Sequence, residues 1–135
     1  MMIEFFMPMA KLPTATHQQK QVTIVNGKPR FYEPDTVRAA RAKLSAHLGQ
    51  HRPAAPLEGP LQAVIKWCYP TTREQLNGQY KTTRGDLDNM AKLMLDVMTR
   101  LRFWQDDAQV ASLVLEKFWA VIPGIYVCVR QLQNA

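Results

Sequence analysis

The chain has 135 residues, which suits one compact domain with its own core and is short for two. No apolar run is long enough to span a bilayer, and the first residues lack the features of a signal peptide. The formal charge is +6, so nucleic acid would be a suitable partner, although a solvated basic surface explains the charge equally well. Cys68 and Cys128 lack metal-ligand spacing, which favours buried free thiols and a cytoplasmic protein.

The first half of the chain predicts a strand, a hairpin and a helix. Residues 2–7 form an apolar run that is typical of a buried strand. The Asn26-Gly27 pair lies between a β-branched run and an aromatic run, which is a strong hairpin signal because both residues tolerate positive φ. The periodicity over 35–48 predicts an amphipathic helix with a basic outer face, and Gly49 is a plausible terminator. The predicted apolar face of this helix consists of Val37, Ala40, Leu44 and Leu48.

The second half predicts a strand over 61–69, a polar loop over 71–85 and a helix over 88–102. The last two apolar runs, 110–122 and 125–132, flank a Pro-Gly pair and predict a closing β-hairpin. The apolar face of the second helix is predicted from Met90, Ala91, Met94, Val97, Met98 and Leu101. The element order β–hairpin–α–β–α–β–β indicates a single α+β domain over the whole chain, with a small mixed or antiparallel sheet and two main helices.

The sequence "GDLDNMAK", residues 85–92, concentrates charged side chains where the polar loop meets the second helix. If the chain is extended before the helix, Asp86 and Asp88 point to the same side, and Lys92 lies one helical turn beyond Asp88. Such oxygen ligands suit Mg²⁺ or Mn²⁺ rather than zinc. The structural alternative is an ordinary helix start, with an aspartate N-cap and an Asp88–Lys92 ion pair that contributes only about 0.3–0.5 kcal/mol.

A second acidic pair, Asp106 and Asp107, precedes the next strand. Two aspartates before a strand are often only a turn. Together with the first pair and the basic charge, however, they fit a phosphodiesterase, in which a basic surface holds the DNA backbone and carboxylates hold the metal that activates water.

The sequence "RGDLDNMAKLMLDVMTRLRFWQDDAQV", residues 84–110, resembles the signature of the RusA-type Holliday junction resolvases. The matching features are D-L-D-N, the lysine four residues after the second aspartate, the aspartate of a following helical turn, and aromatic-x-D-D-x-Q-V. The resemblance implies a RusA-like homodimer that needs Mg²⁺ (or Mn²⁺) and cuts four-way DNA junctions by paired nicks. Two readings remain as alternatives: a nuclease for flaps, forks or other branched DNA, and a non-catalytic nucleic-acid-binding module.

The resemblance also implies roles for particular residues. Asp86, Asp88 and Asp107 are expected to bind the metal and, with Lys92, to carry the catalysis. Residues expected beside this site are Asp106, Asn89 and Asp96, with Asp96 also as a helix-face partner of Lys92. Candidate DNA contacts are Arg30, Arg38, Arg41, Arg73, Lys81 and Arg84.

The separation of the two acidic pairs leaves one question open. A helix over 88–102 is about 22 Å long at roughly 1.5 Å per residue. The five residues from its end to Asp107 cover at most about 17 Å when extended. Asp107 therefore reaches Asp86 of its own chain only if the helix is shorter or the return is very direct, and otherwise the partner subunit supplies it.

Overall fold

The computed structural model describes residues 1–13 and 21–133, with the backbone alone described at 21–22 and 30–32. It has the predicted order of strands and helices. No helix among the described residues is long and apolar enough to cross a membrane. The main elements are β1 (Met2–Pro8), β2 (Gln21–Val25), β3 (Lys28–Tyr32), α1 (Asp35–Leu48), β4 (Leu61–Pro70), α2 (Leu87–Arg100), β5 (Val110–Ala120) and β6 (Gly124–Gln131). Three short 3₁₀ turns are η1 (Gly49–His51), η2 (Glu74–Leu76) and η3 (Asp107–Gln109).

The main sheet is mixed and has the strand order β1-β6-β4-β5. The predicted closing hairpin is wrong, because β4 lies between β5 and β6 and pairs with both. Helix α2 connects β4 to a parallel β5, which therefore takes the edge of the sheet. Strand β6 then returns into the position between β1 and β4, where its apolar residues Ile125, Val127 and Val129 are fully buried.

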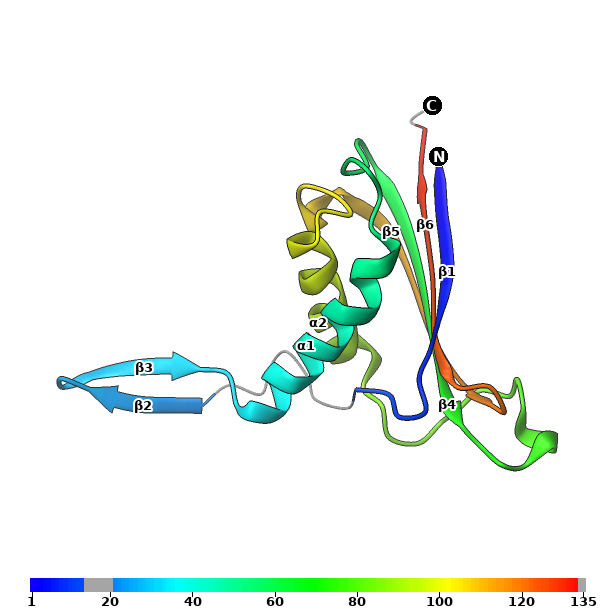
Figure 1. Cartoon of the computed structure of the whole chain (residues 1–135), viewed down its shortest axis with the longest axis horizontal. Coiled ribbons are helices and arrows are strands. Elements are labelled where there is room, and N and C mark those ends of the chain that lie inside the picture. Colours follow the sequence, from blue (N-terminus) through cyan, green and yellow to red (C-terminus); the bar gives the residue numbers. More distant parts are fainter. Residues whose placement is uncertain (14–20, 134–135) are drawn as a thin grey trace.

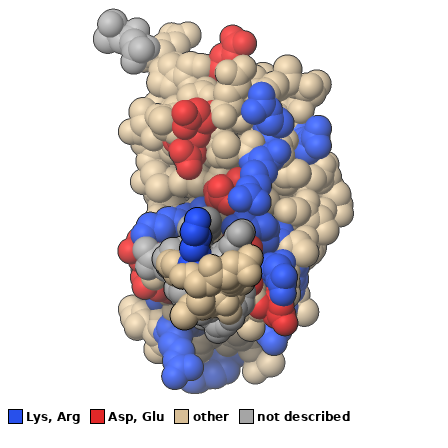
Figure 2. Space-filling view, turned by 90° about the vertical axis from the view of Figure 1, so that its left-hand side faces the viewer, with Lys and Arg blue, Asp and Glu red and all other residues tan. Residues whose placement is uncertain are grey.

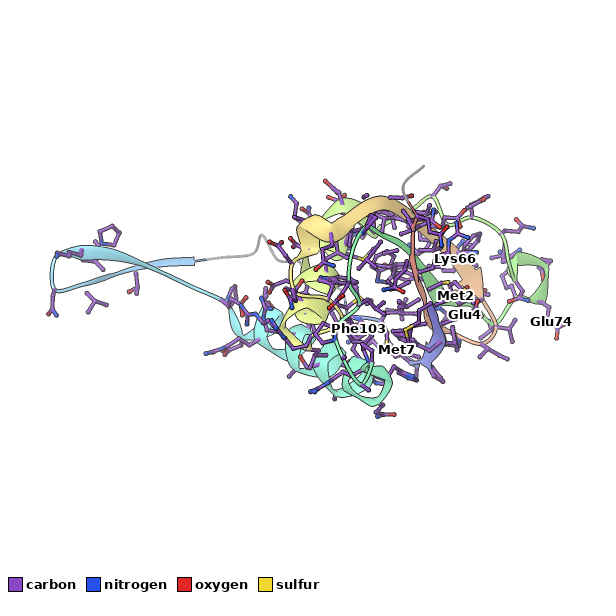
Figure 3. The ribbon with its side chains drawn as sticks, turned by 90° about the horizontal axis from the view of Figure 1, so that it is seen from above. Met2, Glu4, Met7, Lys66, Glu74 and Phe103 are labelled. Carbon is purple, nitrogen blue, oxygen red and sulfur yellow. The ribbon has the colours of Figure 1, made fainter. Side chains whose placement is uncertain are left out.

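Both helices cover one face of this sheet (Figure 1). The alternate β4 residues Leu61, Ala63, Ile65 and Trp67 point into the layer between sheet and helices. Seen from above, Met7 and Phe103 lie in that same layer, whereas Glu4 and Lys66 lie on the opposite face of the sheet (Figure 3). The sheet therefore has one covered face, and the helices and the loops that join them belong to that side.

Helix α1 confirms the predicted apolar face, since Val37, Ala40, Leu44 and Leu48 are all buried. Gly49 does not end the helix in a left-handed conformation, because its φ is −58° and the chain continues into η1. Cys68 and Cys128 are free thiols, but they are half-buried rather than buried because they point to the uncovered side of the sheet.

Strands β2 and β3 form the predicted hairpin, which projects from the body of the molecule (Figure 1). Asn26 and Gly27 form its turn with φ values of 53° and 76°, as a two-residue hairpin turn requires. Ile24 near the tip is 75% exposed. The hairpin therefore contributes little to the core of the domain.

Candidate active site

The loop before α2 is attached to the outer edge of β5. The backbone N–H of Gly78 donates to the carbonyl of Trp119, and the N–H of Lys81 donates to the carbonyl of Lys117. A further bridge joins Tyr80 to Phe118. The polar stretch that the sequence indicated as a loop thus runs along the sheet edge and delivers the chain to the start of α2.

Gly85 determines the backbone conformation directly before α2. Its φ is +129°, and a Cβ atom there would lie 2.7 Å from the Tyr69 hydroxyl oxygen. Since a side chain is disfavoured by both backbone and space, only glycine fits this position without a local shift. The glycine in "GDLDN" therefore places Asp86 close against the sheet, directly before the helix.

Two lysine ammonium groups fix the carbonyls of this turn. The Lys81 ammonium donates to Thr83 Oγ1 at 2.8 Å and to the Arg84 carbonyl. The Lys117 ammonium donates to the carbonyl of Thr83 and, at 2.8 Å, to that of Gly85. These four bonds hold residues 83–85, so the position of the following aspartate is set from β5 as well as from α2.

Lys81 is the one charged residue among the described residues that is classed as buried, with 7% of its surface exposed. Its ammonium lies 4.6 Å from the ring centre of Tyr69 and 5.0 Å from that of Trp119, which offsets part of the cost of burying the charge. Burial and, secondarily, the nearby Lys117 charge lower the pKa of Lys81. The ammonium of Lys81 is thus buried and hydrogen-bonded in the free chain, and its contact with DNA stays a prediction.

Asp86 and Asp88 come together as predicted, at the first turn of α2. Asp86 occupies the N-cap position in an extended conformation, although its side chain does not cap the helix, and Asp88 follows in the first turn. The interaction between their carboxyl groups raises the pKa of Asp86 and lowers the pKa of Asp88. The aspartate at the N-cap position is therefore Asp86, and the carboxyl groups of Asp86 and Asp88 lie close together.

Asn89 and Lys92 border this pair. Asn89 Nδ2 donates to Asp86 Oδ2 at 2.8 Å, which fixes the orientation of that carboxylate. Lys92 is exposed one turn after Asp88, and its charge helps to lower the Asp88 pKa after the larger contribution from Asp86. No Asp88–Lys92 ion pair within 4 Å is present among the described residues, so this lysine remains available to a ligand.

The donor atoms at this position fit a hard divalent cation. Two exposed carboxylates in contact repel one another when both are ionised, and a cation between them removes that repulsion. Asn89 Oδ1, on the adjacent residue, is buried without a hydrogen-bond partner in the described chain. Oxygen-only groups of this type are the ligands that Mg²⁺ takes. No cluster of three acidic, histidine or cysteine side chains occurs within the described part of one chain, so the pair lacks a third acid.

Asp106 and Asp107 lie at the opposite end of α2. The 14 residues of the helix span about 20 Å, and the strand from Val110 up to Lys117, which bonds to Gly85, spans about 23 Å. Asp107 therefore does not join Asp86 within one chain, because the return from the helix leads to the start of β5 and not back along the helix.

The two acids of this second pair differ in their surroundings. Asp106 caps η3 by accepting the Ala108 N–H at 2.9 Å, and Gln109 completes a capping box by accepting the Asp106 N–H at 3.1 Å. Asp107 is exposed, and its side chain has no hydrogen-bond or ion-pair partner in the described chain. Asp106 thus has a structural task that Asp107 lacks, whereas the expected binding of a metal by Asp107 stays a prediction.

Asp96 does not pair with Lys92, and that prediction is wrong. Its carboxylate forms ion pairs with Arg41 of α1 and, at 3.4 Å, with Arg100. Arg41 also pairs with Glu33, and hydrogen bonding to Glu33 is the largest of the effects that raise the Arg41 pKa. Asp96 and Arg41 therefore join the two helices. The guanidinium of Arg41 is largely enclosed by these acids, and its contact with DNA stays a prediction.

The remaining candidate DNA contacts are distributed over the surface. Arg73 and Arg84 are exposed in the loop before α2, and Arg38 is exposed on α1, where it pairs with Asp35. The side chain of Arg30 lies outside the described residues. On the face that bears the hairpin, basic side chains surround its base, and several acidic groups lie beside them (Figure 2).

Comparison with known proteins identifies the class of protein to which this site belongs. The family model of the endodeoxyribonuclease RusA matches residues 2–130, which is nearly the whole chain. The chain belongs to the RusA endodeoxyribonuclease family. The resemblance inferred from residues 84–110 is therefore confirmed and extends over the complete fold, including β1 and β6.

Two curated relatives support the assignment to the RusA family. The chain is 36% identical over 119 residues to the crossover junction endodeoxyribonuclease RusA of Lactococcus phage r1t, an alignment that covers 87% of this chain and 88% of the phage protein. It is also 27% identical over 121 residues to the uncharacterized protein YqaN of Bacillus subtilis (strain 168), covering 82% and 84% of the two chains. Both alignments span most of each protein, so the similarity is not confined to the acidic motif.

The sequence interpretation missed Lys117 and Gln109. Lys117 lies 32 positions after Gly85, and its ammonium reaches that carbonyl only because β5 lies at the edge of the sheet, beside the loop. Gln109 was visible as part of the motif, but its bonds to the carbonyls of Leu57 and Gly59 at 3.1 Å show that it anchors the start of β5. Periodicity carries no signal for either contact.

Proposed function

We propose that this RusA-family endodeoxyribonuclease resolves four-way DNA junctions, and that Asp86, Asp88 and Lys92 form the core of its active site. The observation that carries the proposal is the exposed pair of facing carboxylates at the start of α2, with an exposed lysine one turn away. The phage relative is described as a crossover junction endodeoxyribonuclease, which supports the same substrate for this chain.

The residues of the site have separate tasks in this proposal. Asp86 and Asp88 hold a divalent cation, with Mg²⁺ preferred because all the available ligands are oxygens. Such a cation, when bound, polarises a phosphate and lowers the pKa of a water molecule. Asn89 keeps the Asp86 carboxylate in one orientation through its 2.8 Å hydrogen bond. Lys92 offsets the charge that develops on the phosphate during cleavage.

We further propose that the third carboxylate, Asp107, comes from a partner subunit. The support is the separation of about 20 Å along α2 between the two acidic pairs of one chain. In a dimer with two-fold symmetry each site would combine Asp86 and Asp88 of one subunit with Asp107 of the other. Two equivalent sites suit a four-way junction, whose approximate two-fold symmetry presents two strands for paired nicks.

We expect basic residues of the loop before α2 to contact the DNA backbone. Arg84 precedes the site by two residues, and Arg73 is exposed in the same loop, so we expect both to contact phosphates of the DNA backbone. Such contacts position the DNA without reading its sequence. The selectivity for branched DNA would then come from the spacing and orientation of the two sites in the dimer.

The first test compares cleavage of a synthetic four-way junction with that of a linear duplex of the same sequence. Mg²⁺ should support paired nicks in the junction, and EDTA should abolish them. Asp86→Asn should lower the cleavage rate at least about a hundredfold while junction binding persists. Equal cleavage of the linear duplex, preferred cleavage of flaps or forks, or normal cleavage by Asp86→Asn would each contradict the proposal.

The second test examines which subunit supplies Asp107. Asp86→Asn and Asp107→Asn subunits, each inactive alone, are mixed and allowed to exchange. If the acids act across the dimer, each mixed dimer contains one intact site and regains single-strand nicking of the junction. If the acids act within one chain, both sites of the mixed dimer are defective and no activity returns.

A further inference from the structure

The β2–β3 hairpin carries an apolar tip that nothing in the described chain covers. It forms a two-stranded sheet of its own, separate from the main sheet. Ile24 and Val25 are 75% and 41% exposed, and Pro29, which lies opposite Ile24 in the hairpin, is exposed as well. We propose that this tip inserts at the branch point of a DNA junction, where Ile24 packs against bases that have lost a stacking neighbour.

The inference rests on the proposed function and deepens it. In that proposal the spacing of two sites determines which strands are cut. The hairpin adds a preference for branched DNA at the preceding step, when the junction binds.

The hairpin leaves the body at the end that carries the candidate active site. His51, just beyond α1, stacks on Phe5 with ring centres 4.2 Å apart, and Phe103, just beyond α2, lies 6.1 Å from the same ring. Both helices therefore end at one end of the helix layer and begin at the other (Figure 1). The hairpin precedes α1 as Asp86 precedes α2, so the two features share the end at which the helices begin.

The lengths of the elements give the tip enough reach to contact DNA that is bound at the site. From the ion pair between Arg41 and Asp96, the first residue of α1 is six positions away, about 9 Å, and Asp88 is eight positions away, about 12 Å. Each strand of the hairpin has five residues, so the tip extends about 17 Å from its base. A DNA strand advances about 3.4 Å per nucleotide, and the tip therefore reaches DNA within about five nucleotides of a phosphate held at the site.

The charge of this segment favours DNA as the partner. Residues 5–32, which lie between Glu4 and Glu33, contain no acid. On the face that bears the hairpin, basic side chains surround its base (Figure 2). A polyanion is attracted to such a segment, whereas a second copy of the hairpin would bring like charges together. The bases within residues 5–32 are Lys11, Lys20, Lys28 and Arg30.

The apolar tip favours a branch point over an intact duplex. Isoleucine and proline are among the side chains that proteins insert between base steps, and in a duplex this insertion has to separate stacked bases. In an open four-way junction the innermost base pair of each arm already lacks a neighbour on one side. Ile24 therefore gains apolar contact at a junction without the cost of unstacking, and the tip binds branched DNA more tightly than linear DNA.

The test measures binding in EDTA, so that it does not depend on cleavage. A synthetic four-way junction carries 2-aminopurine beside the branch, and the fluorescence of this base changes when its stacking changes. Wild-type protein should alter the fluorescence on binding, and Ile24→Ser should not. Because the apolar contact is lost, the dissociation constant of Ile24→Ser should rise about tenfold for the junction and stay within about twofold of normal for a linear duplex.

Three further variants isolate the role of the apolar tip. Ile122→Ser makes the same change at a 71% exposed position in the turn between β5 and β6, and it should bind the junction normally. Ile24→Leu retains an apolar side chain and should retain the fluorescence signal. Lys28→Gln removes an exposed charge at the tip and should weaken junction and duplex binding by the same factor. Circular dichroism and sedimentation should show every variant folded and of unchanged mass.

Several results would overturn the inference. These are a normal fluorescence change with Ile24→Ser, an equal loss of junction and duplex affinity in that variant, and an Ile24→Leu protein that behaves like Ile24→Ser. A fall in the mass of Ile24→Ser would show instead that the tip packs against a second copy of the chain.

The outcome also separates this inference from the proposed function. Selective junction binding that Ile24→Ser abolishes, without any cleavage in Mg²⁺, would refute the proposed function and leave the role of the hairpin standing. Normal junction cleavage with an Ile24→Ser protein that keeps its junction affinity would do the reverse.

Discussion

The two ends of α2 carry similar acidic pairs in very different surroundings. At the first turn, Asp86 and Asp88 face each other, and no basic side chain of the described chain forms an ion pair with either. Beyond the last turn, Asp106 is committed to a capping box, while Asp107 has no side-chain partner among the residues that the structure describes. The comparison shows that an aspartate available to a metal is distinguished by what its carboxylate contacts. Spacing along the sequence does not separate a cap from a ligand.

Substitutions of Asp106 and Asp107 should show the largest difference in junction cleavage between two neighbouring acids. Asp107→Asn should reduce junction cleavage at least about a hundredfold, because it removes a metal-binding carboxylate in the proposed dimer, and it should leave the unfolding midpoint unchanged. Asp106→Asn should keep cleavage within a few-fold of normal, since asparagine is as good an N-cap as aspartate. Cleavage rates at saturating Mg²⁺ provide the measurement. Equal losses in the two variants would show that the pair acts as a unit.

The turn before the first pair should be the next most sensitive element. In Gly85→Ala the new methyl group would meet the Tyr69 hydroxyl at 2.7 Å, so the turn and Asp86 must move together. We expect cleavage to fall by about two orders of magnitude, as happens when a reacting group is displaced by about 1 Å.

Gly78→Ala is the matched control for Gly85→Ala, because Gly78 also has a positive φ, of +85°, but a Cβ atom added there would meet no other atom within 4 Å. This control should lose some stability through backbone strain and retain cleavage. If both variants lose activity to the same extent, strain rather than the displacement of Asp86 is responsible.

The helices and strands, and the proximity of Asp86 and Asp88, could be predicted from the sequence because they depend on local patterns. The apolar periodicity over 35–48 and the Asn26-Gly27 turn can be seen in short stretches of sequence, and the structure confirms the helix and the hairpin that they predict. The position of β6 between β1 and β4 is a long-range pairing, and two apolar runs joined by a Pro-Gly turn favour a hairpin when neighbours along the chain are all that can be seen. The contacts of Arg41 and Lys81 also depend on long-range packing. Arg41 meets the carboxylate of Asp96 on the other helix, and Lys81 meets the aromatic ring of Tyr69 in the sheet.

A smaller effect is expected from the lysine that holds the first pair in place. Lys117→Met retains the aliphatic stem but removes the hydrogen bonds to the carbonyls of Thr83 and Gly85. Hydrogen bonds from charged groups contribute about 1.5–3 kcal/mol, so a loss of about ten- to a hundredfold in kcat is the expected result if they serve to position Asp86.

Lys66→Met is the matched control for Lys117→Met. Lys66 also lies in the sheet, but it pairs with Glu116 at 3.7 Å and belongs to the face opposite α2. Its replacement should leave kcat unchanged. Recovery of activity in Lys117→Arg, but not in Lys117→Met, would show that the hydrogen bonds matter rather than the volume of the side chain.

Substitution of Asp96, in the middle of α2, should have the smallest effect on cleavage. Asp96→Asn weakens the pairs with Arg41 and Arg100 and should lower the free energy of unfolding by about 1 kcal/mol, since both pairs are only partly screened from water. Arg100→Gln removes the more exposed pair alone and should cost less. Neither change alters the facing carboxylates, so junction cleavage at a temperature well below unfolding should stay normal in both. A large loss of kcat in a fully folded Asp96→Asn protein would mean that this carboxylate belongs to the site, and that the packing of the two helices controls the chemistry at the end of one of them.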